Sequence, residues 1–221
     1  MKEVGAVIFD WNGTLTSMDA ERELSYKAVV EIFNHYNVPA PSAEAYFSNV
    51  TSDYMNAFYW PHGIPQTATR GDLNKIRTAY ILSKWDPASI LKPNAKDMVR
   101  VLYDRPNTVL GIVSGEHAPL LEKGLNDSDL WQYFQYIKSD AVSKVKWLAD
   151  ALEKIGVTAR QAIYLDDSIE GIKSARSLDM WAVGISDGFA NENDLIAAGA
   201  DVVMPLSSVW TLVRNVKNLH F

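Results

Sequence analysis

The sequence predicts an α/β fold: a doubly wound parallel sheet that carries a small inserted α-helical domain. Short, continuously apolar runs recur along the chain, and such runs are typical of strands buried on both faces of a parallel sheet. Helical patterns separate these runs, and this alternation favours parallel strands joined by right-handed crossovers. The strands are expected at residues 4–9, 108–113, 161–165, 181–185 and, as a weaker signal, 201–204.

Helical periodicity accounts for the intervals in the second half of the chain. Apolar residues at steps of three and four predict one helix over residues 145–155 and another over residues 169–175. Later helices are expected at 195–198 and 209–216. Each of these segments follows or precedes an expected strand, as a parallel sheet requires.

Residues 17–90 form a block without a convincing strand. Three helices are expected in it, over residues 20–36, 43–60 and 72–85. A crossover between parallel strands needs only about 12 residues, so a block of this length predicts a helical module mounted on the sheet. The expected division is a core of residues 1–16 and 91–221, with residues 17–90 as the inserted domain.

Composition excludes several classes of protein. With 21 basic and 27 acidic residues the net charge is −6, so the chain lacks the basic field that nucleic acids require. The absence of cysteine excludes disulfides, thiolate metal sites and cysteine nucleophiles. The first apolar run is too short for a signal peptide, and no run approaches the ~20 residues of a membrane helix. We expect a cytoplasmic monomer or homodimer that binds neither nucleic acid nor membrane.

Polar residues concentrate where the expected strands end. Ligands of open α/β sheets bind at the carboxyl ends of the strands, so residues directly after each apolar run are candidates for a site. Carboxylates, an amide, hydroxyls and a glycine meet this criterion: Asp10, Asn12, Thr14, Ser114, Gly115, Asp166 and Asp167. Lys144 lies just ahead of an expected helix and is expected to converge on the same edge of the sheet.

This combination of residue types has a specific chemistry. Crowded carboxylates repel one another unless a cation lies between them, and hard oxygen ligands suit Mg²⁺. Hydroxyls, a lysine and backbone N–H groups at a helix start can hold a phosphate dianion. Beside Mg²⁺ and a bound phosphate, Asp10 could act as a nucleophile that forms an aspartyl-phosphate.

The chain resembles the haloacid dehalogenase-like hydrolase superfamily over nearly its whole length. The resemblance rests on three motifs in order: Ile8-Phe9-Asp10-x-Asn12-Gly13-Thr14-Leu15, the strand-end Ser114-Gly115 and the strand-end Asp166-Asp167. It implies a Rossmann-like core, a helical cap inserted after the first motif, and a Mg²⁺-dependent phosphatase that acts on a small phosphorylated metabolite.

The resemblance also implies a role for each matching position. Asp10 is expected to be the nucleophile and a Mg²⁺ ligand, and position 12 to offer its backbone carbonyl to the metal. Asp167 is expected to ligate Mg²⁺, with Asp166 in or near the outer shell. The phosphoryl group is expected to contact Thr14, Ser114 with Gly115, and Lys144, although Lys146 competes with Lys144 for this assignment.

Position 12 departs from the family pattern. The family's phosphatases usually carry Asp there, as general acid and base, whereas this chain carries Asn12, whose amide cannot exchange a proton. Such proton transfer is worth typically ~10²–10⁴-fold in rate. The residue therefore leaves several hypotheses open: a slow enzyme, a proton from another group such as His117, a leaving group that needs none, or a catalytically weak binder of a phosphorylated ligand.

Other reactions on the same scaffold are alternatives. A dehalogenase needs no metal, so the pair Asp166-Asp167 is an odd choice for it. A phosphonate hydrolase would use a Schiff-base lysine in the cap, and the lysines available there, Lys27, Lys75 and Lys84, lie in no compelling context. A phosphomutase also remains open. One aromatic cluster of the insert is interpreted as helix packing, with a substrate-facing role as the alternative: Tyr54, Phe58, Tyr59, Trp60 and His62.

Overall fold

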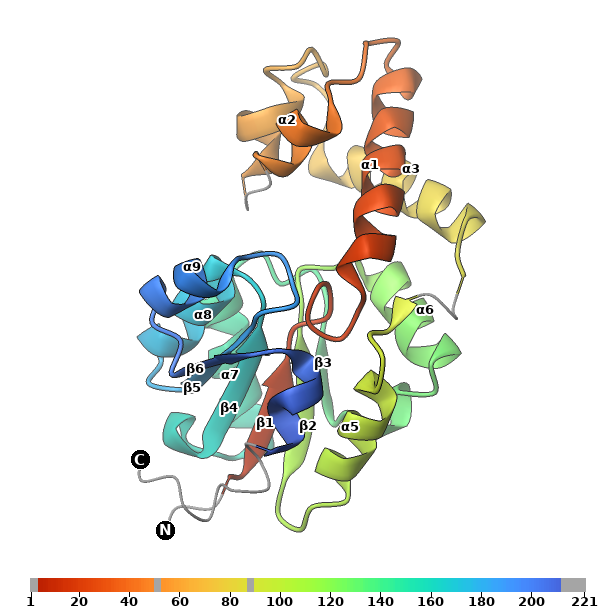
Figure 1. Cartoon of the computed structure of the whole chain (residues 1–221). Coiled ribbons are helices and arrows are strands. Elements are labelled where there is room, and N and C mark those ends of the chain that lie inside the picture. The colour runs from red at the N-terminus through yellow and green to blue at the C-terminus, as the bar shows by residue number, and fades with distance from the viewer. Residues whose placement is uncertain (1–3, 50–52, 87–89, 212–221) are drawn as a thin grey trace. The chain divides into compact units, whose positions relative to one another are not determined.

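The computed structural model describes residues 4–49, 53–86 and 90–211 (Figure 1). The chain divides into two compact units. The core unit comprises Met1–Met18 and Pro87–Phe221, and the helical unit comprises Asp19–Asp86. The core unit holds the sheet and the polar residues that the sequence places at its edge.

Six parallel strands form the sheet of the core unit, in the order β3-β2-β1-β4-β5-β6. Their bounds are Ala6–Phe9 (β1), Val109–Val113 (β2), Tyr136–Lys138 (β3), Ala162–Asp166 (β4), Trp181–Ile185 (β5) and Val202–Met204 (β6). The strand β1 lies between β2 and β4, and all of its residues are buried. This position explains why its sequence is continuously apolar.

The short edge strand β3 is missing from the sequence prediction. It has three residues, all of them partly exposed, because a neighbour pairs with it on one side only. Such a strand needs no continuous apolar run, so the pattern that predicts the buried strands does not detect it.

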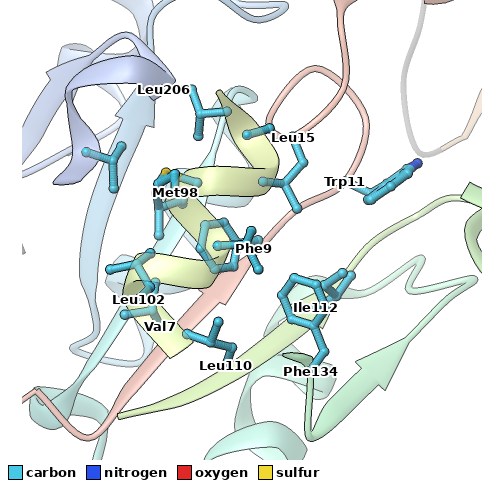
Figure 2. Packing of buried hydrophobic residues seen from close by; sticks show 14 of the residues in the cluster. Val7, Phe9, Trp11, Leu15, Met98, Leu102, Leu110, Ile112, Phe134 and Leu206 are labelled. Atoms are coloured by element: carbon cyan, nitrogen blue, oxygen red, sulfur yellow. The ribbon is translucent and has the colours of Figure 1, made fainter. Parts of the chain in front are cut away.

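Helices cover both faces of the sheet, as a doubly wound fold requires, so the predicted fold class is confirmed. On one face, Met98 and Leu102 of α5 (Ala95–Tyr103) pack on Val7, Phe9 and neighbouring strand residues (Figure 2). The same apolar cluster includes residues of α6 (Ala118–Asp127). The opposite face packs against α7 (Lys144–Ile155), α8 (Ile169–Ser177) and α9 (Glu192–Ala197).

The helical unit contains α1 (Met18–His35, beginning at the end of the core unit), α2 (Ala43–Phe47), a π-helical turn (Met55–Tyr59) and α3 (Arg70–Ser83). The expected continuous helix over 43–60 is therefore wrong. The helix α2 ends at Phe47, with Ser48 as its C-cap, and in the later segment the N–H of Trp60 donates to the Met55 carbonyl, which closes a π turn. The small core of this unit combines aliphatic and aromatic side chains, and Phe33 stacks on Tyr59 in it.

Capping chemistry shifts one predicted boundary. The sequence predicts a helix from residue 72, whereas α3 begins at Arg70. Thr69 and Asp72 form a capping box in which each side chain accepts a hydrogen bond from the other residue's backbone N–H, and this arrangement starts the helix earlier.

The end of the chain is described only to residue 211. Residues 209–211 are helical, and the rest of the helix expected at 209–216 lies outside the described residues. Among the described helices, none combines the length and hydrophobicity needed to cross a bilayer.

Candidate active site

Strand register brings the first two carboxylates together. Phe9 of β1 pairs with Leu165 of β4, and the N–H of Asp10 donates to the Leu165 carbonyl at 2.9 Å. Asp10 and Asp166 therefore follow matched positions on adjacent parallel strands and reach the same edge of the sheet. Both side chains are buried.

Asp167 completes a group of three carboxylates. One oxygen atom from each of Asp10, Asp166 and Asp167 lies within 4.8 Å of the others. Asp167 accepts hydrogen bonds from the hydroxyl of Thr14 at 3.1 Å and from the N–H of Phe189 at 2.7 Å. These contacts connect the end of β4 to the loops that follow β1 and β5.

Two glycines make room for the acidic side chains. A Cβ atom at Gly171 in α8 would overlap the carboxylate of Asp166, and a Cβ atom at Gly188 would overlap the side chain of Asp167. Glycine at these two positions, after β4 and after β5, therefore lets the carboxylate side chains lie directly against the backbone.

Lys144 supplies positive charge to this group. Its Nζ atom lies 2.5 Å from Oδ2 of Asp166 and 3.2 Å from Oδ2 of Asp10. Lys144 begins α7, the first helix after β3, so the edge strand that the sequence analysis missed is the element that leads to it. Lys146 instead lies over the ring of Trp147, 4.6 Å from its centre.

Burial and mutual repulsion make the ionised forms of these carboxylates unfavourable. Burial raises the pKa of Asp10 to about 6, although the charge of Lys144 opposes the rise. Burial and the neighbouring Asp166 and Asp10 raise the pKa of Asp167 to about 8. Burial alone would lower the pKa of Lys144, but the negative charges of Asp10 and Asp166 raise it above its usual value.

The three carboxylates fit a divalent cation. Oδ1 of Asp10 is buried and has no hydrogen-bond partner among the residues that the structure describes, which is a costly arrangement for an acceptor in a protein interior. A hard cation bound by carboxylate oxygens would satisfy this atom and offset the mutual repulsion of the acids, and Mg²⁺ prefers such donors.

The predicted phosphate ligands lie near this group. Thr14 is buried and bonded to Asp167. Ser114 is buried directly after β2, and its hydroxyl oxygen accepts the N–H of Glu116 at 3.2 Å. Gly115 is exposed, and a Cβ atom there would meet nothing within 4 Å, so space does not require glycine at this position.

Asn12 is held by a residue to which the sequence analysis gave no role. Its side-chain amide donates to Oε2 of Glu116 at 3.0 Å, and the other oxygen of Glu116 accepts the N–H of His117 at 2.7 Å. Glu116 is buried. Its place two residues after Ser114 is the one sequence signal that could have pointed to it.

Lys92 is a second residue that the sequence analysis missed. Lys92 is a buried basic residue, with a side chain only 6% exposed. Its Nζ atom donates to the Gly13 carbonyl at 2.6 Å and to Oδ1 of Asp187 at 2.9 Å. No motif surrounds it, because its partners come from loops after β1 and β5 that only the fold brings together.

The remaining candidates have structural contacts. His117 lies at the N-cap of α6, with its backbone N–H on Glu116. In the helical unit, Phe58 and Tyr59 are buried in the apolar core, and Nδ1 of His62 lies 2.7 Å from the Phe58 carbonyl. Helix packing thus accounts for Phe58 and Tyr59.

The fold and the site define an α/β protein with an acidic, lysine-containing centre at the carboxyl ends of its strands. The family model for haloacid dehalogenase-like hydrolases matches residues 7–185. The chain belongs to this family of hydrolases, and the resemblance noted from its motifs is confirmed.

Relatives over the full length agree with this assignment. A phosphoglycolate phosphatase of Synechococcus elongatus is 26% identical over 224 residues, which cover 95% of this chain and 99% of that protein. A structure titled a predicted phosphoglycolate phosphatase, from Haemophilus somnus, has a TM-score of 0.78 at 15% identity and covers 96% of this chain and 99% of its own. A β-phosphoglucomutase from Clostridium difficile has a TM-score of 0.72 at 14% identity, with coverage of 97% and 99%. The two structures support the fold.

Proposed function

We propose that the protein is a Mg²⁺-dependent phosphatase that hydrolyses a small phosphorylated metabolite through an aspartyl-phosphate on Asp10. The observation that carries the proposal is the buried acidic group next to the ammonium group of Lys144, in which one oxygen of Asp10 has no hydrogen-bond partner within the described part of the chain. Membership of the hydrolase family supports the same reaction class.

The contacts of the acidic residues support different roles for them. Asp166 is ion-paired with the ammonium group of Lys144 on one oxygen and accepts hydrogen bonds from Ser168 on the other, whereas the donors to Asp167 are neutral, the Thr14 hydroxyl and the Phe189 N–H. The close ion pair favours an outer-shell position for Asp166. Asp10 and Asp167 are then the carboxylates that would hold Mg²⁺, with the backbone carbonyl of Asn12. The ion would neutralise the acids and the substrate's phosphoryl oxygens.

In the proposed reaction an oxygen of Asp10 attacks phosphorus, and the bond to the ester oxygen breaks. The released ester oxygen takes a proton from solvent, because Asn12 has none to give. Water then attacks the same phosphorus, gives one proton back to solvent, frees the Asp10 carboxylate and leaves inorganic phosphate. Lys144 and the hydroxyl of Ser114 would hold the phosphoryl oxygens, because charged and hydroxyl donors bind this group well. Thr14, whose hydroxyl already donates to Asp167, would contact the same group.

The substrate class follows from the curated relative, which is named for phosphoglycolate. A small phosphate ester of this kind is the first compound to test. The domain division expected from the sequence, with residues 17–90 as a cap that selects the substrate, belongs to this proposal.

A phosphate-release screen over a panel of small phosphate esters, 2-phosphoglycolate included, tests the proposal. We expect release with Mg²⁺, none in EDTA, and none from Asp10→Asn, which keeps the side-chain shape but removes the nucleophile. Asp104→Asn is the matched control, because Asp104 is exposed at the end of α5. Turnover by Asp10→Asn, or by wild type in EDTA, would refute the mechanism.

Product analysis separates the alternatives. Free phosphate indicates a phosphatase, and an isomerised phosphate ester indicates a phosphomutase. A compound that raises the melting temperature without any release of phosphate indicates a binder, in which Asn12 leaves the site without proton transfer.

A further inference from the structure

The buried cation of Lys92 has no place in the proposed reaction, yet it contacts the loop that carries the nucleophile. Its side chain is 6% exposed and forms an ion pair with Asp187, whose side chain is 43% exposed. Burial of a charged side chain is costly unless polar groups satisfy it. A backbone carbonyl of the loop after β1, that of Gly13, is one of the two acceptors that do so.

The position of Lys92 is rigid. Its backbone N–H donates to the Leu15 carbonyl at 2.9 Å, and its carbonyl accepts the N–H of Ala95 at 3.1 Å. Asp187 is held in turn, because Oδ1 also accepts the N–H of Leu206 at 3.1 Å. The ammonium group of Lys92 therefore holds the Gly13 carbonyl of the loop after β1 in one position.

A cation bound to the Gly13 carbonyl determines the direction of the next N–H group. The described chain has no cis peptide bond, and in a planar trans peptide the carbonyl and the following N–H point in opposite directions. The N–H of Thr14 therefore points away from Lys92. The positive φ of Gly13, 70°, is a conformation that glycine adopts without strain and that allows this orientation.

The other side of this peptide faces the acidic group. A Cβ atom at Gly13 would overlap the carboxylate of Asp167, and the hydroxyl of Thr14 donates to that carboxylate. We propose that Lys92 is a positioning residue for phosphate: it orients the Gly13–Thr14 peptide so that the Thr14 N–H points at the phosphoryl group. Its positive charge also polarises the peptide, which makes the N–H a stronger donor to an anion. This inference rests on the proposed function.

The test is titration of inorganic phosphate into the Mg²⁺-loaded protein, with Mg²⁺ affinity measured in parallel. Lys92→Met keeps the length and the apolar stem of the side chain but removes the charge and the donor. We expect phosphate affinity to fall about tenfold or more, the effect of losing a charge-assisted hydrogen bond, with Mg²⁺ affinity within about twofold of wild type. The control is Lys96→Met, because Lys96 pairs with Asp129 at 2.8 Å on the surface, and we expect neither affinity to change.

A measurement on the wild-type protein keeps the proposal testable if Lys92→Met does not fold. In ¹⁵N-labelled protein, inorganic phosphate should shift the Thr14 amide resonance strongly, as expected for a direct donor. An unmoved Thr14 resonance in a protein that binds phosphate overturns the proposal. A folded Lys92→Met that binds phosphate as wild type does, or that loses phosphate and Mg²⁺ affinity equally, overturns it too.

These results are distinguishable from failure of the proposed function. If wild type releases phosphate from esters while Lys92→Met binds phosphate normally, only the role of Lys92 is wrong. If wild type neither hydrolyses esters nor binds phosphate, the proposed function itself is wrong.

Discussion

The acidic group makes the stability of the metal-free protein depend on pH in an unusual direction. Acidic residues commonly ionise more readily in a folded protein, but burial raises the pKa of Asp167 from 3.8 to about 8. Between these values the folded state holds a proton that the unfolded state has lost. The free energy of unfolding must therefore fall as pH rises through this interval.

The magnitude follows from the linkage relation. Each pH unit well inside the interval is worth about 1.4 kcal/mol, and the slope halves as pH reaches the folded pKa of about 8. A rise from about pH 6 to about pH 8 therefore removes roughly 2 kcal/mol through Asp167. For a chain of this size we expect the unfolding temperature in EDTA to fall by roughly 4–9 °C. Asp10, with a pKa raised to about 6, adds to the loss mainly below that pH.

Thermal unfolding in EDTA across this pH range, followed by circular dichroism, measures the effect. Asp167→Asn removes the titrating group and keeps its shape, so this variant should lose the slope and exceed wild type in stability at about pH 8. Asp104→Asn, an exposed control, should keep the wild-type slope. Saturating Mg²⁺ should stabilise wild type more at about pH 8 than at about pH 6, because protons compete with the ion. A wild-type protein that is as stable in EDTA at the higher pH as at the lower would refute this reasoning.

Two further substitutions probe the packing around the site. Gly188→Ala should weaken Mg²⁺ binding at least tenfold, because the new methyl group displaces Asp167. Calorimetric titration of Mg²⁺ measures the affinity. The control is Gly71→Ala, because Gly71 is exposed near the start of α3. Asn12→Asp should lower both stability and turnover, because it places a second carboxylate 3.0 Å from that of Glu116. Asn12→Asp with Glu116→Gln should recover much of the loss, and a gain in turnover by Asn12→Asp alone would contradict the expectation.

Local patterns were sufficient to predict much of the core. The strand β1 is central and buried on both sides, so its whole sequence is apolar and stops at Asp10. The same logic predicted β2, β4 and β5. It failed at β3, whose three partly exposed residues carry no such signal. In the helical unit, periodicity predicted one helix over 43–60, where hydrogen bonding produces a short helix and a π turn.

The candidate site divides in the same way. Asp10, Ser114 and Asp166 could be predicted because each directly follows an apolar run that predicts a strand, and the carboxyl ends of parallel strands meet at one edge. Lys92 and Glu116 could not be predicted as site residues, because neither belongs to a sequence motif or a periodic pattern.

The sequence by itself determined the class of fold and the acids at the strand ends, because burial imposes a period on neighbouring residues. Only the tertiary structure decided which loops meet: Gly13 with Lys92, and Asn12 with Glu116. The first contact joins residues that are 79 positions apart in the sequence, and the second joins residues that are 104 positions apart. Local periodicity cannot predict such contacts, because they depend on the order of the strands in the sheet.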